Sequence, residues 1–217
     1  MSDTQRGSER QHSGRGFELI AVLATGAAKL VFGLRPLFIV AVALFWIGYV
    51  LVRYRRDRSL LRRWGLTLAG GRPALHMIAP FALFGCLVSV VYGLAFGTAH
   101  LNRNLALLLV LYVPWGTIQQ FVLAALFADN LVTLSAEKLS EATAVVICAI
   151  LFSAVHLPQL PLVIVTFLMG LVTTSVFFRT RNILVPGVFH GWFATAFYFF
   201  VMGYDPWQPL VQAVLGG

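Results

Sequence analysis

Charged side chains are scarce in this sequence, and that scarcity already narrows the class of protein. Only 11% of the 217 residues are charged and 59% are hydrophobic, with a mean hydropathy of +0.84. Soluble domains carry about 25% charged and about 45–50% apolar residues. An ordinary soluble domain is therefore excluded. The 18 phenylalanines and 5 tryptophans equally exclude a disordered chain.

Cysteine is also nearly absent. The two cysteines, Cys86 and Cys148, both lie inside apolar runs. Such placement excludes a disulfide framework or a zinc knuckle and predicts two small, buried core residues.

The apolar residues are gathered into long runs, which predict membrane-spanning helices. A span needs roughly 20 apolar residues, so the chain is expected to form an all-α, polytopic transmembrane helix bundle of about six to seven helices in one domain. The expected organisation is a disordered cytoplasmic N-terminal tail at 1–16, a transmembrane domain at 17–202 and a short C-terminal tail at 203–217. Phe17–Gly33 carries Glu18 and Lys29, and the pattern leaves open whether it spans the membrane or lies on it.

Basic residues are concentrated beside one apolar run. Seven of the 16 Lys and Arg residues fall between Arg53 and Arg72. By the positive-inside rule, this loop is expected in the cytoplasm, where it contacts anionic lipids of a membrane that we take to be the bacterial inner (plasma) membrane. No nucleic-acid-binding motif accompanies the charge, so nucleic acid is not expected as a partner. The segment 129–142 is expected to be amphipathic and to return to the inner surface.

Four polar side chains interrupt the apolar runs and are the candidate site. Gln119 lies roughly 13 Å and His190 roughly 10 Å from the inner end of their spans, at 1.5 Å per residue. His156 closes an apolar segment at 142–156 that is roughly 22 Å long, too short for the ~30 Å hydrocarbon core. His156 is therefore expected within the membrane, in a polar cavity shared with His190 and with at least one of Gln119 and Gln120.

Non-catalytic roles explain the same residues. Glutamines within spans can bond neighbouring helices together, and each histidine can be a capped or packed side chain. His156 and His190 could also bind a divalent metal with one weak oxygen ligand, but three dependable ligands are missing. No cofactor is expected.

The order of these residues resembles a family. Phe152-Ser-Ala-Val-His156 matches a Phe-x-x-x-His motif, His190 matches the start of a His-x-x-x-Asn motif, and Gln119-Gln120 stand where a Glu-Glu-x-x-x-Arg motif begins. Over about residues 105–200 the chain is similar to the CAAX prenyl protease and bacteriocin-processing (CPBP, or Abi) intramembrane proteases. The resemblance implies endopeptidase activity, in which the first glutamate activates a water and the histidines and asparagine assist.

Three departures from the family pattern bear on that activity. Gln119 replaces the general-base glutamate, Ala124 the arginine and Ala194 the asparagine. Because an amide oxygen is a very weak base, two interpretations stay open: a CAAX-processing-like endopeptidase acting on a membrane-associated peptide or protein, and a non-catalytic scaffold or binding protein on the same fold. A small transporter is disfavoured, since the sequence shows no internal repeat and no paired intramembrane charges.

Overall fold

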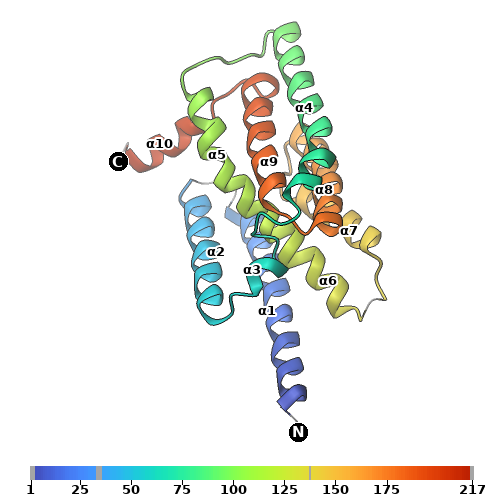
Figure 1. The fold of residues 1–217 in the computed structure, drawn as a ribbon. Helices are drawn as coiled ribbons and strands as arrows, with labels where there is room; N and C mark the ends of the chain where they lie inside the picture. The colour runs from blue at the N-terminus through green and yellow to red at the C-terminus, as the bar shows by residue number, and fades with distance from the viewer. Residues whose placement is uncertain (1–2, 33–35, 137, 216–217) are drawn as a thin grey trace.

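The computed structural model describes residues 3–32, 36–136 and 138–215, and these residues are helical with no strands. Within these ranges, five helices are long and apolar enough to cross a membrane: Leu37–Arg56, Gly71–Phe96, Asn104–Leu134, Leu160–Thr180 and Leu184–Val201. The helix Glu141–Ala154 is apolar but shorter. The expectation of an all-α polytopic bundle is therefore confirmed (Figure 1).

The N-terminal segment differs from the expected disordered tail. A single helix, α1 (Asp3–Phe32), runs through both the polar tail and the apolar run that follows it. Within this helix, Arg15 and Glu18 form hydrogen bonds to other elements of the bundle. In Figure 1, the N-terminal half of α1 projects away from the bundle. With its charges, α1 is not among the five candidate spans.

The remaining helices follow the apolar runs closely. After α1 come α2 (Pro36–Arg56), α3 (Leu60–Arg63) and α4 (Gly71–Phe96). The later helices are α7 (Glu141–Ala154), α8 (Leu160–Thr180), α9 (Leu184–Ala196) and its π-helical continuation η2 (Phe197–Val201). The expected C-terminal tail contains a further helix, α10 (Trp207–Leu215), whose first turn is capped by Asp205 through a 2.9 Å bond from the Trp207 amide.

One long helix replaces the expected span and surface segment between residues 104 and 134. It comprises α5 (Asn104–Gln120), a π-helical stretch η1 (Phe121–Ala128) and α6 (Asp129–Leu134). Asp129 and Asn130, at the start of the segment expected to return to the inner membrane surface, are 6% and 0% exposed. They are thus buried within the protein, and the position of this segment relative to the membrane stays a prediction. Their side chains are buried by partners from elsewhere in the chain. Single π-helical turns occur frequently beside functional sites.

Helices α5 and α9 pack closely against each other, and glycines permit their approach. A Cβ added at Gly191 would lie 2.8 Å from the Cα of Val113, and one added at Gly187 would lie 2.7 Å from the Cα of Thr117. Real Cβ atoms do not approach backbone so closely, so larger residues would force the helices apart. Small residues commonly mediate such contacts within membranes. This packing sets the distance between the polar residues of the two helices.

Candidate polar site within the helix bundle

Three of the four predicted residues meet at one cavity. Gln119 comes from the last turn of α5, His156 follows the end of α7, and His190 lies in the middle of α9. All three line a cavity of about 240 Å³, together with Ala194. The three helices thus bring together residues up to 71 positions apart in the sequence, from Gln119 to His190. Their role in chemistry stays a prediction.

Gln120 lies behind the cavity and supports one of its histidines. Its Nε2 is 2.9 Å from Nδ1 of His190, and the two residues are 0% and 4% exposed. As the amide is oriented, Gln120 donates to Nδ1, so the neutral imidazole carries its proton on Nε2. The Oε1 of Gln120 is buried without a hydrogen-bond partner among the described residues. Gln119 and Gln120 therefore have different surroundings, as their 100° rotation about the helix requires.

His156 has the opposite hydrogen-bonding arrangement. Its Nδ1 is 2.8 Å from the backbone oxygen of Phe152. A carbonyl oxygen only accepts, so Nδ1 must donate, and the Nε2 of the neutral ring keeps its lone pair. His156 thus offers an acceptor, whereas His190 offers a donor.

The ring of Phe152 fixes the two imidazoles relative to each other. Its centroid lies 5.2 Å from that of His156 and 5.7 Å from that of His190, with interplanar angles of 86° and 62°. Edge-to-face contacts of this kind are the favoured arrangement of aromatic rings. Phe152 is itself 4% exposed, so it acts as a rigid spacer. The Phe-x-x-x-His spacing places the aromatic ring and the histidine of one helical turn side by side.

A second, larger cavity adjoins the first. Its volume is about 360 Å³, and it shares Gln119, His156, Ile39 and Trp115 with the smaller cavity. Most of its other walls are apolar side chains of α1, α2 and α7. Gln119 and His156 therefore form a polar junction between an apolar chamber and the chamber that contains His190.

His156 and His190 are the two residues that were predicted to bind a divalent metal, and both line the cavity. Within the described ranges, no group of three or more His, Cys, Asp and Glu residues is placed to hold a metal ion. A divalent metal at His156 and His190 would therefore need ligands other than these residue types, and the metal site stays a prediction.

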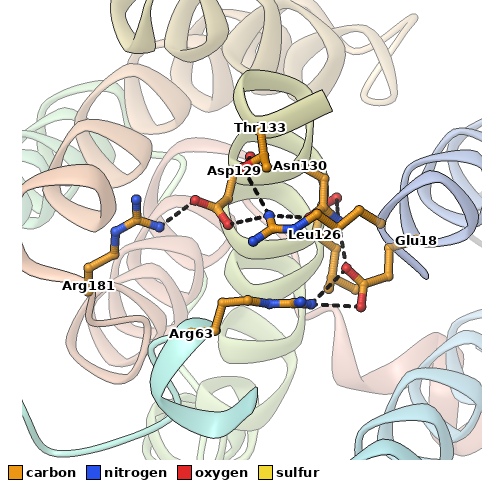
Figure 2. Close-up of polar contacts among 8 residues, drawn as sticks. Glu18, Arg63, Leu126, Asp129, Asn130, Thr133 and Arg181 are labelled. Carbon is orange, nitrogen blue, oxygen red and sulfur yellow. Dashed lines mark hydrogen bonds and ion pairs between the residues drawn. The ribbon is translucent and has the colours of Figure 1, made fainter. Parts of the chain in front are cut away.

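A buried charged network around Glu18 and Asp129 was not predicted from the sequence. Figure 2 shows Glu18 of α1 facing Arg63 of α3 and Asn130 of α6. Glu18 is 0% exposed and accepts bonds from Arg63 Nη2 at 3.0 Å, Asn130 Nδ2 at 2.6 Å and Tyr49 Oη at 2.7 Å. The sequence signal for this network is Glu18, an acidic residue inside an apolar run. No local sequence pattern identifies the residues that pair with it.

Asp129 is the second acid of this network, which joins α1 to the end of α8. Arg15 Nη1 donates to Asp129 Oδ2 at 3.1 Å, to Asn130 Oδ1 at 3.0 Å and to Thr133 Oγ1 at 3.0 Å. Arg181 donates to the other carboxylate oxygen of Asp129 (Figure 2). Both acids are therefore paired with arginines, and neither lines the cavity around His190.

Comparison with known families supports the resemblance seen in the motifs. Residues 121–196 match the family model "Type II CAAX prenyl endopeptidase Rce1-like". The matched segment begins directly after Gln120 and includes Phe152, His156 and His190. Neither the curated proteins nor the solved structures gave a match. The resemblance to CAAX-processing proteases is thus confirmed for η1 to α9, in a chain with helices suited to a membrane.

The packing explains one of the departures from the family pattern. Ala124, where the motif arginine would stand, is 0% exposed and lies in an apolar cluster with Trp64, Phe121 and Phe177. This cluster leaves no room for an arginine. Ala194 differs, because it lines the cavity and leaves a side-chain donor absent there.

Proposed function

We propose that this chain is an integral membrane protein of the CAAX-protease-like type that binds a membrane-associated peptide segment in the cavity around His156 and His190 without hydrolysing it. The observation that carries this proposal is the composition of the cavity wall. Gln119 stands in the place of the general base, and the described residues that line both cavities include no carboxylate. An amide cannot take the proton of an attacking water as a carboxylate does.

The hydrogen-bonding groups of the cavity suit a peptide amide. His156 presents an acceptor at Nε2, and His190 presents a donor at Nε2, as derived from their Nδ1 contacts. A backbone amide offers one N–H and one C=O, so it can satisfy both. Gln119 supplies a further donor and acceptor. Within a membrane, where water is scarce, an unsatisfied backbone group is costly, and such pairing favours binding.

Peptide hydrolysis is the second candidate, and one observation favours it. His156 Nε2 keeps a free lone pair, His156 lines both cavities together with Gln119, and histidine is the commonest general base. In this case His156 would take the proton of a water oriented by Gln119. We rank hydrolysis second to binding because Ala194 supplies no side-chain donor to the cavity. Only His190 and Gln119 would then stabilise the developing oxyanion.

The decisive experiment compares binding with cleavage. The protein is reconstituted in nanodiscs with a library of membrane-spanning peptides that carry photo-crosslinking groups and a quenched fluorophore. We expect crosslinking without cleavage, and weaker crosslinking for His156→Ala and His190→Ala. His76→Ala is the matched control, because His76 is exposed on α4 and lies outside both cavities.

The outcomes separate the two candidates. Cleavage by the unmodified chain that is lost in His156→Ala, with an unchanged melting temperature, would establish the peptidase instead. Equal crosslinking by the unmodified chain and both site variants would remove the binding proposal. In either function we propose that the 53–72 loop faces the cytoplasm and contacts anionic lipids of the bacterial inner membrane.

A further inference from the structure

Helix α1 contacts the bundle through a buried charged side chain, while many of its apolar side chains are exposed. Among its residues 13–32, Glu18 is the one side chain that is buried, whereas Phe17, Ile20 and Val31 are 56%, 67% and 78% exposed. Apolar surface gains little by leaving lipid for a helix interface, since lipid tails are as apolar as leucine. The polar contacts of Arg15 and Glu18 therefore decide whether α1 stays docked.

The same helix forms one wall of the apolar cavity. Its residues Val22, Leu23, Thr25, Gly26, Ala27, Lys29 and Leu30 line this cavity. His156 and Gln119 line this cavity too, and they also line the cavity of the candidate site. If α1 moved aside, the hydrocarbon of the membrane would reach the candidate site directly.

We propose that α1 is a lateral gate to the candidate site and that the buried Glu18–Arg63–Asn130 network is its latch. With the latch formed, α1 stays in place as one wall of the apolar cavity. With the latch broken, α1 separates from η1 and α6 and admits a membrane-embedded chain between α1 and α7. Helix α1 meets the end of α7 at this place, because a Cβ added at Gly26 would lie 3.6 Å from Val155 Cγ1, an ordinary van der Waals distance.

The network has the chemistry of a two-state latch. Glu18 accepts four hydrogen bonds from three residues on three different elements. A buried charge that loses one partner is strongly destabilised, so partial opening is unfavourable and the network forms or breaks as a unit. The two-state element is therefore α1 itself, and Glu18 is the group on which its docking depends.

The test measures how readily the cavity wall behind α1 is reached. Val122→Cys serves as the probe, because Val122 lines the apolar cavity and packs in the cluster that includes Ala21 and Val22 of α1. Its alkylation by N-ethylmaleimide is followed by mass spectrometry of the full chain in nanodiscs. Cys148 is an internal reference, since it is 0% exposed and is not part of either cavity wall.

We expect Glu18→Leu to accelerate alkylation at position 122 by at least about tenfold while Cys148 stays unreactive. Glu18→Gln, which keeps the size of the side chain, is the gentler variant if Glu18→Leu is not recovered, and it should accelerate alkylation less. Asp57→Asn is the matched control, because Asp57 is an exposed carboxylate that bonds to Ser59. It should leave the rate unchanged.

Two results would refute the proposal that α1 is a lateral gate. Unchanged alkylation at position 122 in both Glu18 variants would show that α1 is held by its apolar contacts. Equal acceleration at Cys148 would show that the network stabilises the whole bundle rather than one helix. Neither result depends on peptide binding, so the gate and the proposed function fail separately.

Discussion

The glycine contacts between α5 and α9 lead to a sharp prediction about the candidate site. Substitution of Gly191 by alanine places a Cβ 2.8 Å from the Cα and 2.9 Å from the backbone nitrogen of Val113. Both opposing atoms belong to the backbone, so no side-chain rotation relieves the contact. Helix α9 must move away from α5 by several tenths of an ångström.

The expected loss of stability follows from that displacement. Overpacking of a close-packed interior costs about 1–3 kcal/mol. For a chain of this size, each kcal/mol lowers the melting temperature by about 2–4 °C, so Gly191→Ala should melt about 2–12 °C lower. The same displacement should lengthen the 2.9 Å contact between Gln120 and His190 beyond hydrogen-bonding range.

Two measurements on the reconstituted protein check this prediction. The first is the melting temperature, and the second is the nitrogen chemical shift of the His190 ring in protein labelled with ¹⁵N-histidine. Gly48→Ala is the matched control, because Gly48 lies inside α2 and an added Cβ meets nothing within 4 Å. Alanine is favoured over glycine there by about 0.5–1 kcal/mol, so the control should melt at the same temperature or slightly higher.

The opposite outcome would refute the reasoning. If Gly191→Ala and Gly48→Ala melt alike and the His190 shift is unchanged, the α5–α9 contact does not set the geometry of the site. A lowered melting temperature with an unchanged shift would show that stability, but not the Gln120–His190 bond, depends on this contact.

Three further predictions concern the buried charges, the missing motif residues and the topology. Arg63→Ala leaves Glu18 buried without its charge partner and should lower the free energy of unfolding by about 3–5 kcal/mol, measured by thermal unfolding. A decrease below about 1 kcal/mol would contradict the pairing of Glu18 with Arg63. Ala124→Arg should abolish folding because Ala124 is 0% exposed. Gln119→Glu should fold because Gln119 lines a cavity. Size-exclusion profiles of the two variants should therefore differ. Ser59→Cys should be alkylated by an impermeant maleimide only from the cytoplasmic side of sealed vesicles, and labelling from the outer side alone would reverse the topology.

The local pattern of the sequence was sufficient for the helical class. Runs of apolar residues reveal a membrane helix without knowledge of its neighbours, because a span satisfies its own backbone groups. The same logic predicted a candidate site at Gln119, Gln120, His156 and His190, since a polar group in an apolar run needs a polar partner. The Phe-x-x-x-His spacing was equally local, because residues four apart share a helix face.

Long-range packing decided what the local pattern left open. The two adjacent glutamines are equivalent in sequence, but only the rotation of α5 against α9 determined that Gln119 faces the cavity and Gln120 bonds to His190. The burial of Asn130 depends on Glu18, which lies 112 residues earlier. No local periodicity encodes such contacts, because they arise only when helices distant in sequence pack together and bury each other's polar groups.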